Sequence, residues 1–464
     1  MLVALAGIMF SVLVALLIVD RVLAKGDVLS SGSVIIYFSI LGWIPLAYFA
    51  AVPDALGRLI LEPIAPEYRD LGLVTQAYVW AIISTIFLYV GSVFGSKIRT
   101  AGLDSLGLWL FASKQAWDHA RFPGRTVKVV CLAALGSGLA ALFYYVGRLG
   151  GFAFLWDNLA LRTTLSAGMG YLTSFYSFSL VFGGALALVA FRRSKVVSIM
   201  ILVGVFVALV SVGQRAPAIG FIFVVLVVRH FMVRRWRGVW NLKFAAVSFV
   251  AAALVLGLVQ FRSPGAIGVY MSSPMQLVGD SVAGIEEHLI RRLGTLERDV
   301  VVLGYFKEHD VWMGAGYYSL LAAPVPRGLW SDKPPVDTGQ YLRAMAAGQE
   351  VDPPVPSREL QATSWPDGHW AGYMNFHIPG YLAMLLLSGY LVGWWYRFAR
   401  YSGFHFGAVV GYGMIAWNGA PAMSPYSIVG LLMTFFWLFF WVRIYAVFKR
   451  LGSSAPTMSP VGRR

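Results

Sequence analysis

Long apolar runs, each followed by a short polar connection, make up most of the chain. A helix needs about 20 apolar residues to cross the hydrocarbon core of a bilayer. Segments of this kind predict about 11 membrane-spanning helices (10 to 12), at approximately 2–19, 33–51, 72–94, 129–147, 171–190, 196–212, 216–229, 244–261, 375–395, 406–420 and 426–446. The fold class that we expect is therefore an all-α polytopic integral membrane protein.

The distribution of charge supports this fold class and orients the helices. Only 13% of the residues are charged, against roughly 25% in a soluble domain. Arg21 and Lys25 follow the first apolar run and no basic residue precedes it, which predicts an N-terminus on the outer side. The inward-facing connections and the tail from Arg443 then hold 23 of the 37 Lys and Arg but 4 of the 22 Asp and Glu. The positive-inside bias thus explains the net charge of +15, and no nucleic-acid partner is expected. The inner segment 95–128 is predicted as an amphipathic helix against membrane lipids.

One apolar run, Val196 to Val228, carries a single charged residue, Arg215. As one helix its 33 residues would be about 50 Å long, which exceeds the bilayer core of about 30 Å. Two short spans joined by a tight turn at Gly213–Pro217 fit better, with the turn at the outer face. Arg215 is then either a side chain that marks the membrane boundary or an anion-binding group.

The largest polar segment runs from Arg262 to Tyr373 on the outer side, and its 112 residues include 13 of the 22 acidic ones. Apolar spacing predicts an amphipathic helix over 274–307, with its charged residues on solvated faces. The sequence PVPRGLWSDKPP predicts a rigid loop that presents Arg327, Asp332 and Lys333, and 335–372 is predicted as a polar loop.

Aromatic and polar residues alternate where this segment enters the next span. Trp365, Trp370 and Tyr373 are typical of a carbohydrate-binding platform, and also of the aromatic belt that anchors a helix at the interface. The belt does not explain the polar residues His369, Asn375 and His377 at the same depth.

The order of these features resembles O-antigen polymerases, the oligosaccharide repeat-unit polymerases of bacterial surface polysaccharide assembly. The matching residues are Gly213–Arg215, Pro326–Trp330 with Lys333–Pro334, and Tyr373–Asn375–Phe376 with Gly380. The chain departs from the family pattern at Ala216 and His377, where glycines are frequent, and at Ala371–Gly372, where a glutamate is frequent.

The resemblance implies a GT-C-like glycosyltransferase in the bacterial inner membrane, with its N-terminus periplasmic and its C-terminus cytoplasmic. It implies an undecaprenyl-pyrophosphate-linked oligosaccharide as substrate, no cofactor, and a chain-length regulator and a flippase as partners. In this topology residues 1–261 hold spans 1 to 8, 262–374 form the large periplasmic loop, 375–446 hold spans 9 to 11, and 447–464 are a cytoplasmic tail.

The implied reaction assigns roles to side chains. A departing pyrophosphate needs permanent cations, and the candidates are Arg215, Arg262, Arg292, Arg327 and Lys333. The acceptor hydroxyl needs a base, for which the candidates are His369, Glu297 and His377. The candidate glycan-binding residues are Trp365, Trp370, Tyr373 and Asn375. No Cys, His or carboxylate spacing resembles a metal cluster, so no metal is expected.

Two other functions stay open. An O-antigen ligase would differ only in its acceptor. A lipid-linked oligosaccharide flippase or another transporter is less favoured, because the predicted spans contain no Asp or Glu for ion coupling.

Overall fold

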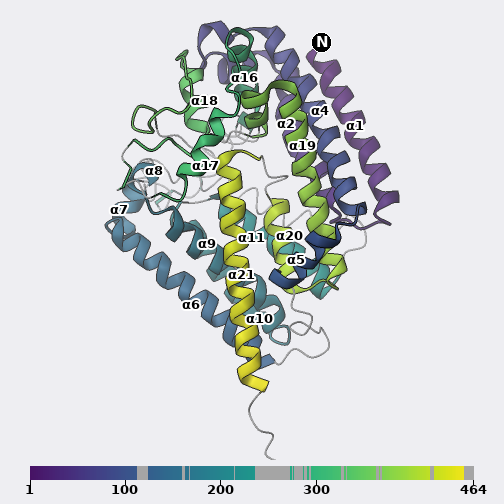
Figure 1. Ribbon diagram of the computed structural model, residues 1–464, viewed down its shortest axis with the longest axis vertical. Coiled ribbons are helices and arrows are strands. Elements are labelled where there is room, and N and C mark those ends of the chain that lie inside the picture. Colours follow the sequence, from purple (N-terminus) through teal and green to yellow (C-terminus); the bar gives the residue numbers. More distant parts are fainter. Residues whose placement is uncertain are drawn as a thin grey trace, which may run out of the picture.

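The computed structural model (Figure 1) shows helices joined by irregular connections, with no strand in the part of the chain that it describes. The described residues are 1–111, 124–158, 162–166, 168–213, 215–235, 272–273, 275, 286, 290–291, 294–325, 329–330, 332–361, 365, 368–417 and 423–453. Eight helices in these ranges are long and apolar enough to cross a membrane: Leu2–Leu23, Ser31–Ala51, Leu71–Lys97, Gly124–Arg148, Gly170–Ala190, Ala216–Val233, Trp370–Tyr401 and Pro425–Phe448. A polytopic, all-helical membrane protein is thereby confirmed.

The longer helices are α1 (Leu2–Leu23), α2 (Ser31–Ala51), α4 (Leu71–Lys97), α5 (Ala101–Phe111), α6 (Gly124–Arg148), α9 (Gly170–Ala190), α10 (Lys195–Val210), α11 (Arg215–Val228), α16 (Leu296–Glu308), α19 (Trp370–Tyr401), α20 (Phe406–Trp417) and α21 (Pro425–Ser453). Shorter helices are α3 (Pro53–Leu56), η1 (Gly57–Leu61), η2 (Pro66–Tyr68), α7 (Gly151–Asp157), α8 (Arg162–Leu165), η4 (Arg229–Val233), η6 (Ala315–Tyr317), α17 (Tyr318–Ala322) and α18 (Gly339–Ala346).

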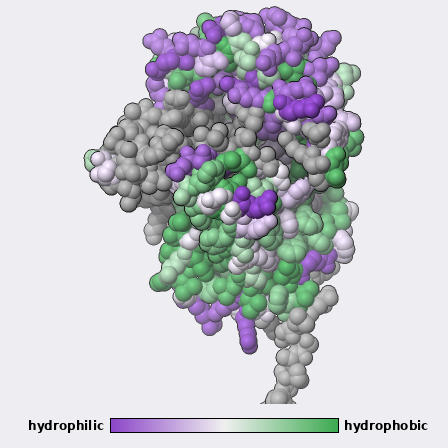
Figure 2. Space-filling model, turned by 90° about the vertical axis from the view of Figure 1, so that its left-hand side faces the viewer, coloured by the Kyte–Doolittle hydropathy of each residue, from purple (hydrophilic) through white to green (hydrophobic). Residues whose placement is uncertain are grey.

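The two ends of the molecule differ in composition. Figure 1 shows the N-terminus at the same end as α16 and α18, and the last turns of α21 at the other end. Figure 2 shows a hydrophobic band between a large hydrophilic cap and a smaller hydrophilic margin. We call the end with the N-terminus and residues 294–361 the outer end and the opposite one the inner end, as the sequence predicts. The band has the surface that a lipid-embedded region requires.

Helices α4 and α19 lie side by side at an unusually short separation. A Cβ atom on Gly91 or Gly95 of α4 would overlap a carbonyl oxygen of α19, and one on Gly389 or Gly393 of α19 would overlap a carbonyl oxygen of α4. Each pair is spaced by four residues, so both helices present a small-xxx-small face to each other. In a membrane such faces let two backbones approach and gain van der Waals contact that larger side chains would prevent.

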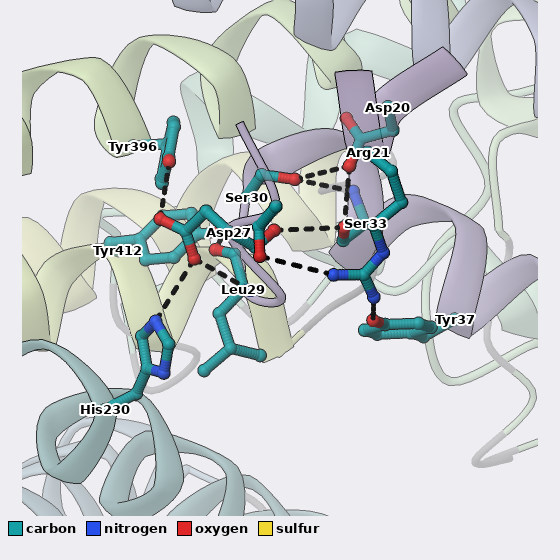
Figure 3. A network of polar contacts seen from close by, with 11 residues as sticks. Asp20, Arg21, Asp27, Leu29, Ser30, Ser33, Tyr37, His230, Tyr396 and Tyr412 are labelled. Atoms are coloured by element: carbon teal, nitrogen blue, oxygen red, sulfur yellow. Dashed lines mark hydrogen bonds and ion pairs between the residues drawn. The ribbon is translucent and has the colours of Figure 1, made fainter. Parts of the chain in front are cut away.

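The connection between α1 and α2 is held at the inner end by hydrogen bonds to three other elements (Figure 3). The Asp27 carboxylate accepts a hydrogen bond from Tyr396 of α19 at 2.7 Å and lies 3.1 Å from Nε2 of His230 in η4. Tyr412 of α20 donates to the carbonyl oxygen of Leu29 at 2.9 Å. Burial on its own would raise the pKa of Asp27, but the hydrogen bonds from His230, Tyr396 and Leu29 outweigh it and hold the pKa below its ordinary value.

A tight turn does separate the two apolar helices, but it lies at residues 211–213, whereas Arg215 and Pro217 of the expected turn Gly213–Pro217 belong to α11. Helix α10 ends at Val210, Gly213 has a left-handed φ of 69°, and α11 begins at Arg215. Gly213 meets this conformation without the Cβ clash that other residues suffer.

Other helix boundaries differ from those expected. Helix α1 continues past residue 19 and includes Asp20, so the expectation that the spans contain no acidic residue is wrong. Helix α19 begins at Trp370 rather than at residue 375, and the chain inside it is broken at Phe376–His377. The predicted span 244–261 lies outside the described residues.

The polar segment is more ordered than its pattern predicts. A continuous helix over 274–307 is wrong, because Gly294 and Thr295 are non-helical and α16 starts at Leu296. Thr295 is a poor helix residue and its hydroxyl instead donates to Asp299 at 2.8 Å. Glu297, Arg298 and Asp299 of α16 are not solvated, since all residues from Leu296 to Phe306 are buried, and only Lys307 and Glu308 at its end are exposed. The supposed loop 335–372 contains α18, whose Tyr341, Leu342 and Met345 are buried.

A glycine substitution tests the contact between α4 and α19. Gly393→Ala places a methyl group against the carbonyl oxygen of Ser92, so we expect a loss of about 1–3 kcal/mol of stability and a lower thermal midpoint in detergent. The matched control is Gly42→Ala in α2, where no heavy atom lies within 4 Å of the added carbon. Equal midpoints for the two variants would contradict this account of the packing.

Candidate functional site

The polar segment is attached to the outer end of α19 by a buried aromatic and acidic cluster. The indole nitrogen of Trp370 donates to the Asp299 carboxylate at 2.7 Å, and both residues are buried. The Trp370 ring stacks on Tyr381 with centroids 4.7 Å apart. Helix α16 therefore meets the first turns of α19 through a hydrogen bond that is shielded from water, where such bonds are strongest.

Asp299 is a buried acid with an altered proton affinity. Burial raises the pKa of Asp299 to about 6, although Arg298 and the hydrogen bonds from Thr295 and Trp370 act in the opposite direction. Sequence reasoning did not select Asp299 among the acidic residues of this helix. Its position immediately before the apolar run Val300–Leu303 was the only sequence signal that it faces inward.

A second attachment runs through the Tyr-x-Asn-Phe residues. Asn375 is fully buried, its side-chain oxygen accepts from the backbone N–H of Gly316 at 2.9 Å, and its amide donates to the carbonyl of Ala371 at 2.8 Å. The N–H of Trp312 donates to the carbonyl of Met374 at 2.9 Å. Asn375 thus fixes the 312–317 connection to α19, and its polar atoms are already occupied.

The backbone of α19 is broken directly after this asparagine. Phe376 has φ −142° and ψ 17°, and His377 has φ 57° and ψ −152°. A side chain at this second conformation costs of order 1–3 kcal/mol, and such strain concentrates at functional sites. Residues 376–379 are exposed, and Nε2 of His377 lies 3.3 Å from the Tyr373 hydroxyl. His377 is therefore an accessible imidazole held at a strained break.

The other expected bases have different surroundings. Glu297 is buried and forms an ion pair with Arg291 at 3.0 Å, with further hydrogen bonds of 3.2 and 3.3 Å to the same guanidinium. His369 directly precedes α19, and its Nε2 atom is shielded from solvent. Of the three candidates, His377 is the one with an exposed side chain.

The expected glycan-binding residues do not form one open platform. Trp370, Tyr373 and Asn375 are buried, while Trp365 is partly exposed and has the guanidinium of Arg343 at 5.6 Å from its ring centroid. The Trp365 ring therefore keeps some accessible surface, whereas a face of the Trp370 ring is covered by Tyr381.

Lys333 was expected to face an anionic ligand, but its ammonium group points into the interior of the polar segment. It is buried and donates to the carbonyl oxygens of Ala323 at 2.9 Å and Val325 at 2.8 Å. Two of its three N–H donors thereby close the proline-containing loop. Asp332 pairs with Arg358 at 3.0 Å.

Most of the expected arginines lie where the structure gives no side-chain description. Arg262, Arg292 and Arg327 are outside the described residues, and for Arg215 only its place as the first residue of α11 is described. Sequence reasoning missed Arg162 of α8, which donates to the carbonyl oxygen of Val212 at 3.2 Å. The Arg162 guanidinium therefore lies at the turn that precedes Arg215 in the chain.

Exposed apolar side chains surround the break in α19. Phe376 stacks on Tyr317 with centroids 6.1 Å apart, and the Tyr317 hydroxyl donates to the carbonyl of Met423, just before α21. Close to this contact in the chain, Met313 and Leu321 are 79% and 77% exposed. Such exposure in a polar segment marks a surface that meets lipid or another apolar ligand.

The described residues thus show an exposed imidazole with apolar side chains near it and, elsewhere in the chain, an arginine side chain at the turn before α11. Among the described residues, no three His, Cys, Asp or Glu side chains gather as metal ligands would. Comparisons of this chain with protein-family models, with curated proteins and with solved structures gave no match.

The substitution Asp299→Asn tests how the buried carboxyl group makes stability depend on pH. Because the folded-state pKa of about 6 lies above the ordinary 3.8, its stabilising contribution is complete below pH 3.8 and is lost as the pH rises to 6. We expect the wild-type protein to lose about 3 kcal/mol across this window and Asp299→Asn, which still accepts from Trp370, to lose much less. Thermal midpoints in detergent between pH 4 and pH 7 measure this, and parallel curves for the two proteins would rule it out.

Proposed function

We propose that the chain is a membrane glycosyltransferase that polymerises undecaprenyl-pyrophosphate-linked oligosaccharide repeat units into O-antigen or exopolysaccharide. The observation that carries the proposal is the packing of residues 294–361 against the break in α19, because the Tyr-x-Asn-Phe residues lie at that break. The resemblance rests on the same residues, so its motif coincides with a backbone break at which a non-glycine residue has a positive φ.

The chemistry required of the site is modest. The donor carries pyrophosphate as its leaving group, so the main demand is for fixed positive charge near the membrane surface. Within the proposal Arg215, the first residue of α11, and Arg162, which donates to the turn just before it, would supply this charge, and Arg262, Arg292 and Arg327 are further candidates. Arginine suits this role because its fork pairs with two phosphate oxygens and keeps its charge at all relevant pH values.

The acceptor sugar needs a group that takes the proton of its attacking hydroxyl. Within the proposal this group is His377, which is exposed and is oriented by Tyr373. Trp365 would hold a sugar ring, and the exposed Met313, Leu321 and Phe376 would receive the polyprenyl chain. Glu297 and Lys333 take positioning roles, because their charged groups are bound within the protein.

The finer architecture belongs to the same proposal. Adding α10, α20 and the segment 244–261 to the eight candidate spans gives the expected total of about 11. We further propose a GT-C-like arrangement in the bacterial inner membrane, a periplasmic outer end, and a chain-length regulator and a flippase as partners. An O-antigen ligase shares this chemistry and differs in its acceptor.

A lipid-linked oligosaccharide flippase is the second candidate function. Asp20 is a buried carboxylate inside a candidate span, and a membrane-embedded acid is typical of a transport pathway. The two functions predict different intermediates. Loss of a polymerase leaves one repeat unit on the final acceptor, loss of a ligase leaves lipid-linked polymer, and loss of a flippase leaves no lipid-linked repeat outside.

Replacing Arg215 tests the anion site. We expect Arg215→Ala to reduce long-chain polymer by about a hundredfold or more while single repeat units still reach the final acceptor. Gel profiles of surface polysaccharide from a deletion strain that carries each variant give the measurement. The control is Arg358→Ala, which removes an exposed arginine of the outer end and should leave the profile unchanged. Full-length chains from Arg215→Ala cells would exclude this role.

His377→Gly separates the imidazole from the backbone that carries it. Glycine accepts a φ of 57° freely, so the variant should gain about 1–3 kcal/mol of stability. Loss of the proton acceptor should at the same time lower the polymerisation rate by about 10²-fold or more. A stable variant that polymerises at the wild-type rate would remove His377 from the reaction.

A further inference from the structure

A small polar cavity lies at the inner end, far from the break in α19. Its volume is about 50 Å³, and residues from the ends of α1, α4 and α19 and the start of α2 line it. Because one buried water needs roughly 10–15 Å³, the cavity holds about three to five water-sized groups.

The floor of the cavity holds a buried carboxyl group that has no basic side chain beside it among the described residues. Asp20 is 4% exposed, and its Oδ2 atom accepts hydrogen bonds from the hydroxyls of Ser30 and Ser33, both at 2.6 Å. Among the described residues, no cation lies within ion-pair distance of this carboxylate. A buried carboxylate that has only neutral donors is costly, so a cationic ligand in the cavity would stabilise it.

A second polar group in the lining lacks a partner in the described structure. Ser92 of α4 is fully buried, and its hydroxyl makes no hydrogen bond to any described residue. The close approach of α4 to α19 fixes this serine, because Gly393 packs on its carbonyl oxygen. The hydroxyl oxygen is shielded from solvent in the described structure, and a rotation of this short lining side chain would bring it to a donor inside the cavity.

The mouth of the cavity carries the opposite charge. Lys97 at the end of α4 and Arg400 near the end of α19 are exposed, and Arg400 lies over the ring of Tyr396 at 5.7 Å. Leu23 beside them is exposed as well. Basic residues that border apolar surface at the end of a span lie at the depth of lipid phosphates.

We propose that this cavity binds the headgroup of an aminoethyl phospholipid from the adjacent leaflet. The ammonium group occupies the floor, where it donates to Asp20 and Ser92, and the phosphate lies between Lys97 and Arg400. The aminoethyl chain, with its three non-hydrogen atoms, fits the volume of the floor. The site is separate from the proposed polymerisation chemistry and does not depend on it.

The charges distinguish this ligand from two simpler ones. An anionic glycerol headgroup satisfies Lys97 and Arg400 but leaves the Asp20 charge buried and unpaired. A bare sodium ion satisfies Asp20 but adds a third positive charge beside the two at the mouth. Only a zwitterion with its phosphate outward matches both ends of the cavity.

Native mass spectrometry of the full-length chain in detergent, with equal amounts of phosphatidylethanolamine and phosphatidylglycerol, tests the proposal. We expect the wild type to retain phosphatidylethanolamine preferentially. Asp20→Asn should lower the retention of this lipid about tenfold and Ser92→Ala severalfold, and neither variant should change the retention of phosphatidylglycerol. Lys97→Ala should lower retention of both lipids. Asparagine still accepts from Ser30 and Ser33, and the Ser92 hydroxyl has no described bond to lose, so both variants should fold.

Ser137→Ala is the matched control, because within the described part of the chain its hydroxyl donates only to the carbonyl of Ala134 in α6. Equal retention of the two lipids by the wild type, or an unchanged preference in Asp20→Asn and Ser92→Ala, would overturn the proposal. A sodium effect would also overturn it. If sodium chloride raises the thermal midpoint of the wild type more than choline chloride does, and Asp20→Asn abolishes this difference, the cavity binds the metal ion.

Discussion

The close contact of α4 with α19 is the constraint on which the rest of the structure depends. Four glycines, two on each helix, let the backbones meet, and any larger side chain at these positions would overlap a carbonyl oxygen of the partner helix. Without a hydrophobic driving force inside lipid, such contact is a main source of helix association. Helix α19 is thereby fixed along its length, and both of its ends carry polar structure that needs a rigid base.

At the outer end α19 supports the polar segment through buried hydrogen bonds. Helix α16 is buried along nearly its whole length, charged residues included, and each buried charge has a specific partner where the contacts are described. Asp299 with Trp370 and Asn375 with Gly316 tie the segment to the last residues before the break. The exposed His377 follows immediately, so the strain at the break is maintained by bonds on its N-terminal side.

At the inner end the same helix closes a different polar network. Tyr396 bonds Asp27 in the α1–α2 connection, and Arg400 lies one turn further at the mouth of the cavity that contains Asp20. Asp20, which is buried, and Asp27, which is partly buried, are held at this end by hydroxyl, imidazole and backbone donors. One helix thus carries the broken backbone at one end of the molecule and borders the Asp20 cavity at the other.

The sequence by itself determined the membrane-spanning class, most spans and the turn at Gly213, because apolar length and a glycine at a helix break are local properties. It also located the residues around Tyr373 and Asn375 as unusual. Tertiary structure decided which polar groups are buried and which are accessible. Asp299 and Lys333 turned inward, Arg162 reached the arginine turn, and Asp20 joined a cavity with Ser92, and all of these depend on neighbours distant in the chain. The spacing of apolar residues in the sequence indicates on which face of a helix a residue lies. Whether a charged side chain is buried depends instead on the partner that another part of the chain places beside it.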